Sequence, residues 1–254
     1  MPEIRRFSPI VVTGLFLICA GAYAQTPGGP PAPNPDLTTN VAHSQVNVGY
    51  YAATQMYRYH GSYNVTYNAV KVAGVGLYGF GDVDVEVRTA DSEFQPDRLL
   101  GTFEIGGRKS AGNGSIGLHF RHQSTHNVDR TDRPRLSWEQ VGVRYQVAKP
   151  SYSFAISTAH YVHHDNCRYD NDVDLRGSYV LIPSGRNPVS LAGDLHYVGE
   201  SGEGRSGYVD YWIEPSIALS RNASAFLGYG LVHDIDRPDG RTDNPLMIGL
   251  RVSI

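Results

Sequence analysis

Three polar side chains near the middle of the chain have the types and spacing of an acyl-transfer site. His122 and Ser124 are two residues apart in the run SIGLHFRHQSTH, which spans 115–126, and Glu139 follows after a polar segment. A serine hydroxyl becomes a nucleophile when a histidine takes its proton, and that histidine needs an acceptor to orient its ring. The three residues therefore predict a nucleophile (Ser124), a general base (His122) and an orienting carboxylate (Glu139).

The run that carries His122 and Ser124 has the pattern of a β-strand with one apolar and one polar face. Ile116, Leu118 and Phe120 lie on one face, and Gly117, His119 and Arg121 lie on the other. This period of two is typical of a strand with one side in an apolar medium. His122 and Ser124 continue the apolar face, so the polar pair is predicted on the lipid side of a membrane strand.

A second alternating run, 138–148, provides a partner strand. If Ile116 lies opposite Tyr145, apolar residues meet on the outer face and large residues meet small ones on the inner face. The other pairs are Leu118 with Val143, Phe120 with Val141, Gly117 with Arg144, His119 with Gly142 and Ser124 with Ser137. The same register puts His122 directly opposite Glu139, which brings the predicted site together.

Alternating segments continue along the chain, separated by turn signals. We expect strands at 42–58, 62–73, 78–89, 100–109, 114–124, 138–148, 151–162, 172–182, 188–198, 207–220, 223–232 and 246–254. Short turns alternate with longer polar loops, as in bacterial outer-membrane barrels. The predicted fold is all-β, a transmembrane antiparallel up-and-down β-barrel over 42–254 with twelve strands, or with ten if the N-terminal pair does not form.

The residues expected to face the lumen carry balanced charge. The set comprises Asp84, Glu86, Glu104, Asp174, Asp194, Asp210, Arg88, Arg108, Arg121, Arg144, Arg176 and Arg251. Such residues are expected to pair into a network that fills a small barrel. An open selective pore more often shows one sign of charge.

The N-terminal segment 1–24 has the pattern of a secretory signal peptide. Arg5 and Arg6 precede a short apolar core, and Ala22-Tyr23-Ala24 resembles a cleavage site. A Pro-rich linker is expected at 25–41. Cleavage leaves Cys167 as the one cysteine of the mature chain, so no internal disulfide can form. Export and barrel pattern together predict the bacterial cell outer membrane.

Charge and composition limit the classes of partner. The formal net charge is -3 and the chain has no basic stripe, which argues against nucleic acid. The expected partners are outer-membrane lipids and lipopolysaccharide. The polar run 129–133 is expected to be a solvated loop, with contact of its arginines to lipopolysaccharide phosphates as the alternative. The sequence leaves the oligomeric state open.

Several histidines and acids are weak metal candidates. His126, His163, His164 and Asp165 could meet above the barrel, but adjacent histidines seldom bind one ion, so loop polarity is favoured. Asp234, Asp236 and Asp239 precede Gly240 with a spacing that differs from an EF-hand loop. We expect no resident cofactor, although a hydrolase of this type could use calcium.

The segment 119–139 resembles two families of outer-membrane acyl hydrolases. Outer-membrane phospholipase A, a twelve-stranded barrel, has a His-x-Ser-Asn-Gly motif that works with an Asn in a Ser-Trp-Asn run; outer-membrane lipid A 3-O-deacylase pairs His-x-Ser with a Glu. This chain is similar to the first in predicted strand number and in Ser137-Trp138, and to the second in Glu139. The resemblance implies ester hydrolysis at the lipid-facing surface by Ser124, His122 and Glu139.

This chain departs from the phospholipase pattern directly after the serine. Thr125-His126 replaces Asn-Gly, so the part of the motif linked to the oxyanion hole is missing, and the loop to Glu139 is longer. A strand that leaves the membrane core also becomes polar without any catalytic role. The sequence therefore favours a non-enzymatic barrel with a structural, adhesive or narrow-channel role, and keeps a phospholipid or lipid A acyl hydrolase as the alternative.

Overall fold

The computed structural model describes residues 42–53, 57–88, 96–127, 135–165, 169–183, 187–200, 207–233 and 242–254. The predicted signal peptide and linker, Cys167, the run 129–133 and the three acids near Gly240 lie outside these ranges. Within the described ranges, no helix is long and apolar enough to cross a membrane.

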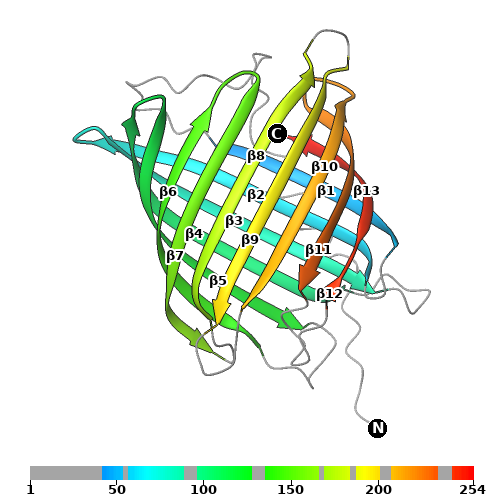
Figure 1. Cartoon of the computed structure of the whole chain (residues 1–254), viewed down its shortest axis with the longest axis horizontal. Helices are drawn as coiled ribbons and strands as arrows, with labels where there is room; N and C mark the ends of the chain where they lie inside the picture. Colours follow the sequence, from blue (N-terminus) through cyan, green and yellow to red (C-terminus); the bar gives the residue numbers. More distant parts are fainter. Residues whose placement is uncertain are drawn as a thin grey trace. The chain divides into compact units, whose positions relative to one another are not determined.

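Twelve long strands and one short strand make up the described fold (Figure 1). The first six are β1 (Ala42–Ala53), β2 (Tyr57–Val72), β3 (Val75–Arg88), β4 (Pro96–Ala111), β5 (Gly114–Asn127) and β6 (Ser137–Ala148). The others are β7 (Tyr152–Asp165), β8 (Tyr169–Ile182), β9 (Val189–Glu200), β10 (Tyr208–Ala218), β11 (Ala223–His233), β12 (Thr242–Asp243) and β13 (Leu246–Ser253).

The strands form a closed antiparallel up-and-down barrel. Each long strand pairs with its neighbours in sequence, and β1 pairs with β13 to close the ring. Both ends of the barrel sequence meet there, because the amide of Ile254 donates to the carbonyl of Ser44. The predicted fold class and the predicted count of twelve strands are confirmed, with β12 as a two-residue addition.

The two ends of the barrel differ in their connections. At one end, called the turn end here, β2 and β3 are joined by residues 73–74 and β4 and β5 by 112–113. At the other, the loop end, β3 and β4 are joined by 89–95 and β5 and β6 by 128–136. In bacterial barrels the short turns face the periplasm and the long loops face outside, which orients this one.

Apolar side chains cover the outside of the barrel. Leu118 is 65% exposed, and exposed Val, Ile or Leu side chains occur on every long strand. Representative members are Val48, Val70, Leu77, Ile105, Val143, Ile156, Leu181, Leu195, Ile213, Leu227 and Leu250. Exposed tyrosines lie toward both ends, such as Tyr59 near the loop end and Tyr152 near the turn end. An apolar belt between aromatic ends is the surface that a bilayer requires.

The inside of the barrel is polar on the side of the turn end. The charged residues predicted to face the lumen do face it, apart from Arg88, whose side chain the structure does not describe. They pair with one another as expected, for instance Arg176 with Asp174 and Asp194. An ion-paired lumen is the arrangement that balanced inward charge predicts.

An apolar cluster inside the barrel was not predicted. Its buried members are Leu136, Trp138, Tyr161, Tyr169 and Val198, with Tyr208 packed against them. Trp138 and Tyr169 meet edge to face with ring centroids 5.8 Å apart. These side chains come from the loop-end portions of β6 to β10, so they fill that part of the lumen beside those strands.

Several predicted strand boundaries were wrong, and two connections illustrate this. The connection between the first two strands was predicted between 58 and 62. It lies at 54–56, and Tyr59 and Gly61 are within β2, where they pair with β1. The connection between β7 and β8 is only 166–168, because both strands extend into the predicted loop 163–171. Backbone pairing between β7 and β8 continues past the apolar belt, so polarity alone made these two predicted strands too short.

Candidate functional site

The three predicted catalytic residues lie at the loop end of β5 and β6. The predicted register of the two strands is confirmed, with Ile116 opposite Tyr145 and His122 opposite Glu139. His122 and Glu139 share the outward face with the exposed Leu118 and Val141. The register therefore positions a histidine and a carboxylate side by side at the lipid-facing rim.

The histidine and the carboxylate are within ion-pair distance. His122 Nδ1 lies 3.6 Å from Glu139 Oε1, and both side chains are about a third exposed. This contact can orient the imidazole ring. It leaves the Nε2 atom of His122 directed away from the carboxylate.

Ser124 makes its hydrogen bond with a different histidine. Its Oγ lies 3.3 Å from Nε2 of His126, which is two residues farther along the same face of β5. In the described part of the chain, Ser124 has no hydrogen bond with His122, and His126 has no ion pair with an acid. The structure thus divides the expected interactions between two histidines that flank the serine.

Small residues flank Ser124 on both neighbouring strands. Its partner on β4 is Gly101 and its partner on β6 is Ser137. A Cβ atom at Gly101 would lie 3.9 Å from Ser124 Oγ, so the missing side chain leaves space beside the hydroxyl. Ser124 itself is 8% exposed. Gly101 carried no signal in the sequence, because its importance depends on the pairing of β4 with β5.

The strand ladder continues beyond the site and fixes its geometry. Thr125 N donates to Leu136 O at 2.9 Å, and Leu136 N donates to Thr125 Oγ1 at 3.2 Å. These bonds hold the two strands together although nine residues connect them. The first of these bonds uses the backbone amide of Thr125, which follows Ser124, so this amide is not available to an oxyanion.

The weak metal candidates do not form a centre. His163 Nε2 lies 3.6 Å from Asp165 Oδ1, while His126 contacts Ser124. His164 pairs through the backbone with the position of Trp138. Among the residues that the structure describes, no three His, Cys, Asp or Glu side chains come together in a way that could hold a metal ion.

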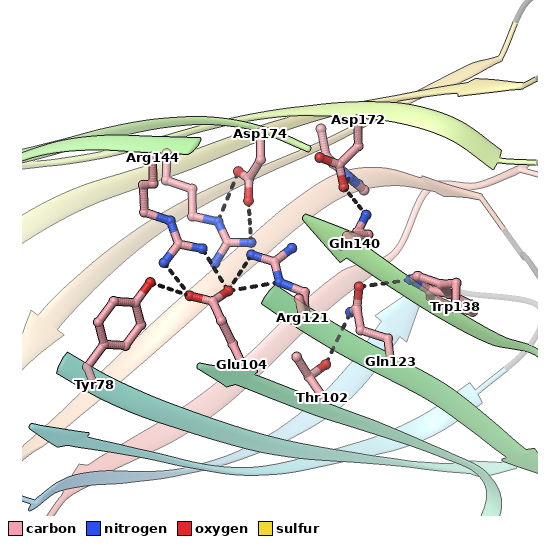
Figure 2. A network of polar contacts seen from close by, with 12 residues as sticks. Tyr78, Thr102, Glu104, Arg121, Gln123, Trp138, Gln140, Arg144, Asp172 and Asp174 are labelled. Atoms are coloured by element: carbon pink, nitrogen blue, oxygen red, sulfur yellow. Dashed lines mark hydrogen bonds and ion pairs between the residues drawn. The ribbon is translucent and has the colours of Figure 1, made fainter. Parts of the chain in front are cut away.

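A second polar assembly lies in the lumen, where Glu104 is its centre (Figure 2). Glu104 is 2% exposed and accepts bonds from both guanidinium nitrogens of Arg144 at 2.8 and 2.9 Å. Arg121 and the hydroxyl of Tyr78 also donate to it, each at 2.9 Å. This carboxylate cross-links four strands, β3 to β6, from inside the barrel.

Two cavities occupy the lumen. The first has a volume of about 460 Å³ and extends from Arg108 and Gln146 toward Asp82 and Asp84. The second has a volume of about 360 Å³ and lies between β1 to β4 and β10 to β13, with Glu86 in its wall. Sequence reasoning predicted a filled lumen and missed both spaces.

Comparison with known proteins supports the fold. No family model matches the sequence, and no curated protein does. Outer-membrane phospholipase from Salmonella typhi, a dimer with bound calcium, is similar with a TM-score of 0.59 and 8% identity over 85% of this chain and 92% of that one. An active-site mutant of phospholipase A from Escherichia coli has a TM-score of 0.61 and 9% identity over 87% and 94%. A KdgM porin has a TM-score of 0.48 and 11% identity over 84% and 99%.

The fold and its surface give the location of the chain. A closed antiparallel barrel with an apolar outside and a polar inside satisfies all its backbone groups within a bilayer. The architecture is that of bacterial outer-membrane barrels. The chain is an outer-membrane β-barrel protein, as the sequence predicted.

Proposed function

For this outer-membrane barrel we propose acyl ester hydrolysis at the lipid surface. The observation that carries the proposal is the pairing of His122 with Glu139, at 3.6 Å, beside Ser124 on the lipid-facing rim. The pair lies on the same outward face as the exposed Leu118 and Val141, where lipid acyl chains pack, so a substrate ester at the rim is within its reach. The substrate class is an acyl ester of a phospholipid or of lipid A in the outer leaflet.

The proposed mechanism uses Ser124 as nucleophile, His122 as base and Glu139 as the residue that positions the base. The Oγ atom bonds to the acyl carbon while the ester bond to the lipid alcohol breaks. The serine proton passes to His122 and then to the leaving alkoxide. Water then cleaves the acyl-enzyme, which releases the fatty acid and restores Ser124.

We assign the base to His122 because it is the histidine with a carboxylate partner. In the proposed mechanism the hydrogen bond between Ser124 and His126 is the resting arrangement, and a rotation about one side-chain bond of Ser124 redirects its hydroxyl. Catalytic hydrogen bonds are often absent from structures without substrate. The hydroxyl of Ser137, which is paired with Ser124 across the ladder, is the donor that this proposal assigns to the oxyanion.

The test measures fatty acid release by the purified full-length barrel from mixed micelles containing phospholipid or lipopolysaccharide, with and without calcium. Ser124→Ala and His122→Gln should each lower the rate by about a thousandfold or more. Equal rates for wild type and Ser124→Ala would overturn the proposal. If His126→Gln loses activity while His122→Gln keeps full activity, the base is His126 and Glu139 has no positioning role.

The alternative is a barrel without enzymatic activity, with a structural, adhesive or narrow-channel role. The two lumen cavities favour the channel form of this alternative over the other two. A lumen pathway and a rim hydrolase use different faces of the strands, so one does not exclude the other.

A further inference from the structure

Arg108 lies in the lumen near the turn end and forms no ion pair with an acid among the described residues. Its Nη2 atom donates to Asn68 Oδ1 at 2.6 Å, and its Cζ atom lies 5.5 Å from the centre of the Tyr78 ring. Both partners are neutral, so the charge of this guanidinium is not compensated and further N–H donors are left for a ligand. Four other lumen arginines do pair with acids, namely Arg121, Arg144, Arg176 and Arg251.

The carboxylate at the centre of the lumen network does not neutralise Arg108. Tyr78 stands between the two groups, because its ring faces the guanidinium and its hydroxyl donates to Glu104 Oε1 at 2.9 Å (Figure 2). Glu104 also binds both Arg121 and Arg144. Its negative charge is therefore already shared between two other cations.

Glycines lie on both sides of Arg108 in the strand ladder, and a second cation follows beyond one of them. The partners of Arg108 are Gly76 on β3 and Gly117 on β5. Gly76 pairs on its other side with Lys71 of β2, so Lys71, Gly76 and Arg108 form one row on the inward face, with the two cations roughly 9.4–9.8 Å apart at Cα. A Cβ atom at Gly76 would meet only the backbone oxygen of Arg108, at 3.8 Å, so there is room between the cations.

The turn end as a whole carries cations and no acids. In the described part of the chain, every Asp and Glu lies at least four residues from the turn-end limit of its strand, and none lies in a turn at that end. Glu214, the nearest by this count, is paired with Arg251. The potential at this end therefore favours an anion. The described cations in the turns or within three residues of them are Lys71, Arg108, Lys109, Lys149, Arg221 and Arg251.

The first lumen cavity, of about 460 Å³, reaches this row. Arg108 lies in its wall with Ser115 and Gln146, which are one and two residues from the turn-end limits of β5 and β6. A serine hydroxyl and a glutamine amide both donate hydrogen bonds. This part of the cavity thus combines a cation with neutral donors. The acids of the wall lie at least seven residues from the turn-end limits of their strands, and they are Asp82, Asp84, Glu104 and Asp174.

We propose that this part of the lumen binds the phosphate group of a small soluble phosphate ester that enters from the turn end. A guanidinium can hold two phosphate oxygens as a fork, and an ammonium adds a compact point charge. A doubly charged phosphate suits two cations better than a singly charged carboxylate does. The residues of this turn-end site are Lys71, Arg108, Ser115 and Gln146.

The ester is a soluble one rather than a lipid headgroup, because the turn-end site faces the lumen. Val72, next to Lys71, is 56% exposed on the opposite, lipid-facing side of β2. The turn-end site is independent of the proposed hydrolase site, which lies on the outer face at the loop end.

The experiment titrates the purified full-length barrel in maltoside micelles with glycerol 3-phosphate and with inorganic phosphate, at low ionic strength, by isothermal titration calorimetry. Wild type should bind both probes, and Arg108→Gln should weaken binding about tenfold or more. The matched control is Lys109→Gln, which removes the next cation of β4, an exposed residue on the outer face opposite Ile116. It should change the affinity by about twofold at most.

Two variants of Gly76 test the space between the cations without a change of charge. Gly76→Leu places a side chain between Lys71 and Arg108 and should weaken binding about tenfold or more. Gly76→Ala should bind like wild type, because its Cβ lies at an ordinary distance of 3.8 Å from the nearest atom. Circular dichroism of each variant establishes that the barrel has folded.

A further arm separates the two sources of phosphate. Phosphatidylcholine added to the micelles supplies lipid phosphate without net charge, and it should not compete with glycerol 3-phosphate. A loss of affinity of about tenfold in its presence would overturn the assignment to a soluble ester. No binding of either probe by wild type, equal affinity in wild type and Arg108→Gln, or an equal loss in Lys109→Gln and Arg108→Gln would overturn the turn-end site itself.

Discussion

His122 on β5 and Glu139 on β6 face each other at the lipid-facing rim, with Nδ1 and Oε1 3.6 Å apart. Nine residues separate the ends of their strands, yet the ladder sets their distance through the bonds of Thr125 with Leu136. The pair is thus held by backbone pairing rather than by a flexible loop. Sites on regular elements are more accurately positioned than sites on loops.

The role of Glu139 can be tested by removing its acceptor in two ways. Glu139→Ala should lower kcat for acyl ester hydrolysis by about a hundredfold with little change in KM, because the base loses its orientation. Glu139→Gln should lose less, since its amide oxygen still accepts a hydrogen bond. Equal losses in both variants, or a change in KM alone, would contradict a positioning role.

Space beside Ser124 is the second requirement of the proposed site. Gly101→Leu should abolish hydrolysis, because the new side chain fills the gap next to the hydroxyl. Gly101→Ala is the matched control, since its Cβ lies at an ordinary contact distance of 3.9 Å from Ser124 Oγ. If the leucine variant hydrolyses lipid at the wild-type rate, substrate does not enter beside Gly101.

Removal of the charge on Glu104 should destabilise the barrel from inside. Glu104→Gln leaves Arg121 and Arg144 without their carboxylate partner and should cost about 3–5 kcal/mol of unfolding free energy. Urea unfolding of the barrel in phospholipid vesicles measures the effect. The control is Asp165→Asn, an exposed acid at the rim, which should change the free energy by about 0.5 kcal/mol at most.

Close packing of His119 on Gly142 gives a second prediction about stability. An added Cβ at Gly142 would lie 2.6 Å from Cε1 and Nε2 of His119 and 2.6 Å from the carbonyl of Thr158. Gly142→Ala should therefore destabilise the barrel by about 1–3 kcal/mol in the same unfolding measurement. The double variant with His119→Ala should recover only part of that loss, because the Thr158 backbone cannot move away. Full recovery would show that the imidazole alone opposes the methyl group.

The turn between β2 and β3 should tolerate a stabilising change. Ala73 and Gly74 have φ angles of 48° and 81°, which is the left-handed region at both central positions of a two-residue hairpin. Asparagine adopts this conformation more readily than alanine. Ala73→Asn should raise the free energy of unfolding by about 0.5–1 kcal/mol. An unchanged or lower urea midpoint would contradict this reading of the turn.

Much of the barrel could be predicted because a membrane strand has two chemically different faces. In β5 and β6 the alternation of apolar and polar residues, together with the match of His119 to Gly142, left one register that satisfied both faces. The predicted boundary between β1 and β2 was wrong because the polarity of Tyr59 and Gly61 does not indicate where a strand begins or ends. Pairing with a neighbour, rather than local pattern, decides where such a strand ends.

The fold class, the inward charges and the approach of His122 to Glu139 could be predicted from the sequence, and the strand count was narrowed to twelve or ten, because these depend on alternation and on pairing between neighbours in sequence. Tertiary structure decided the partner of Ser124, the space beside Gly101, the apolar cluster around Tyr169 and the two lumen cavities. These depend on side-chain rotamers and on which residues meet across a closed barrel. Residues far apart in the chain meet in the lumen only after β1 pairs with β13, and no periodicity in the sequence records how their side chains fill that space.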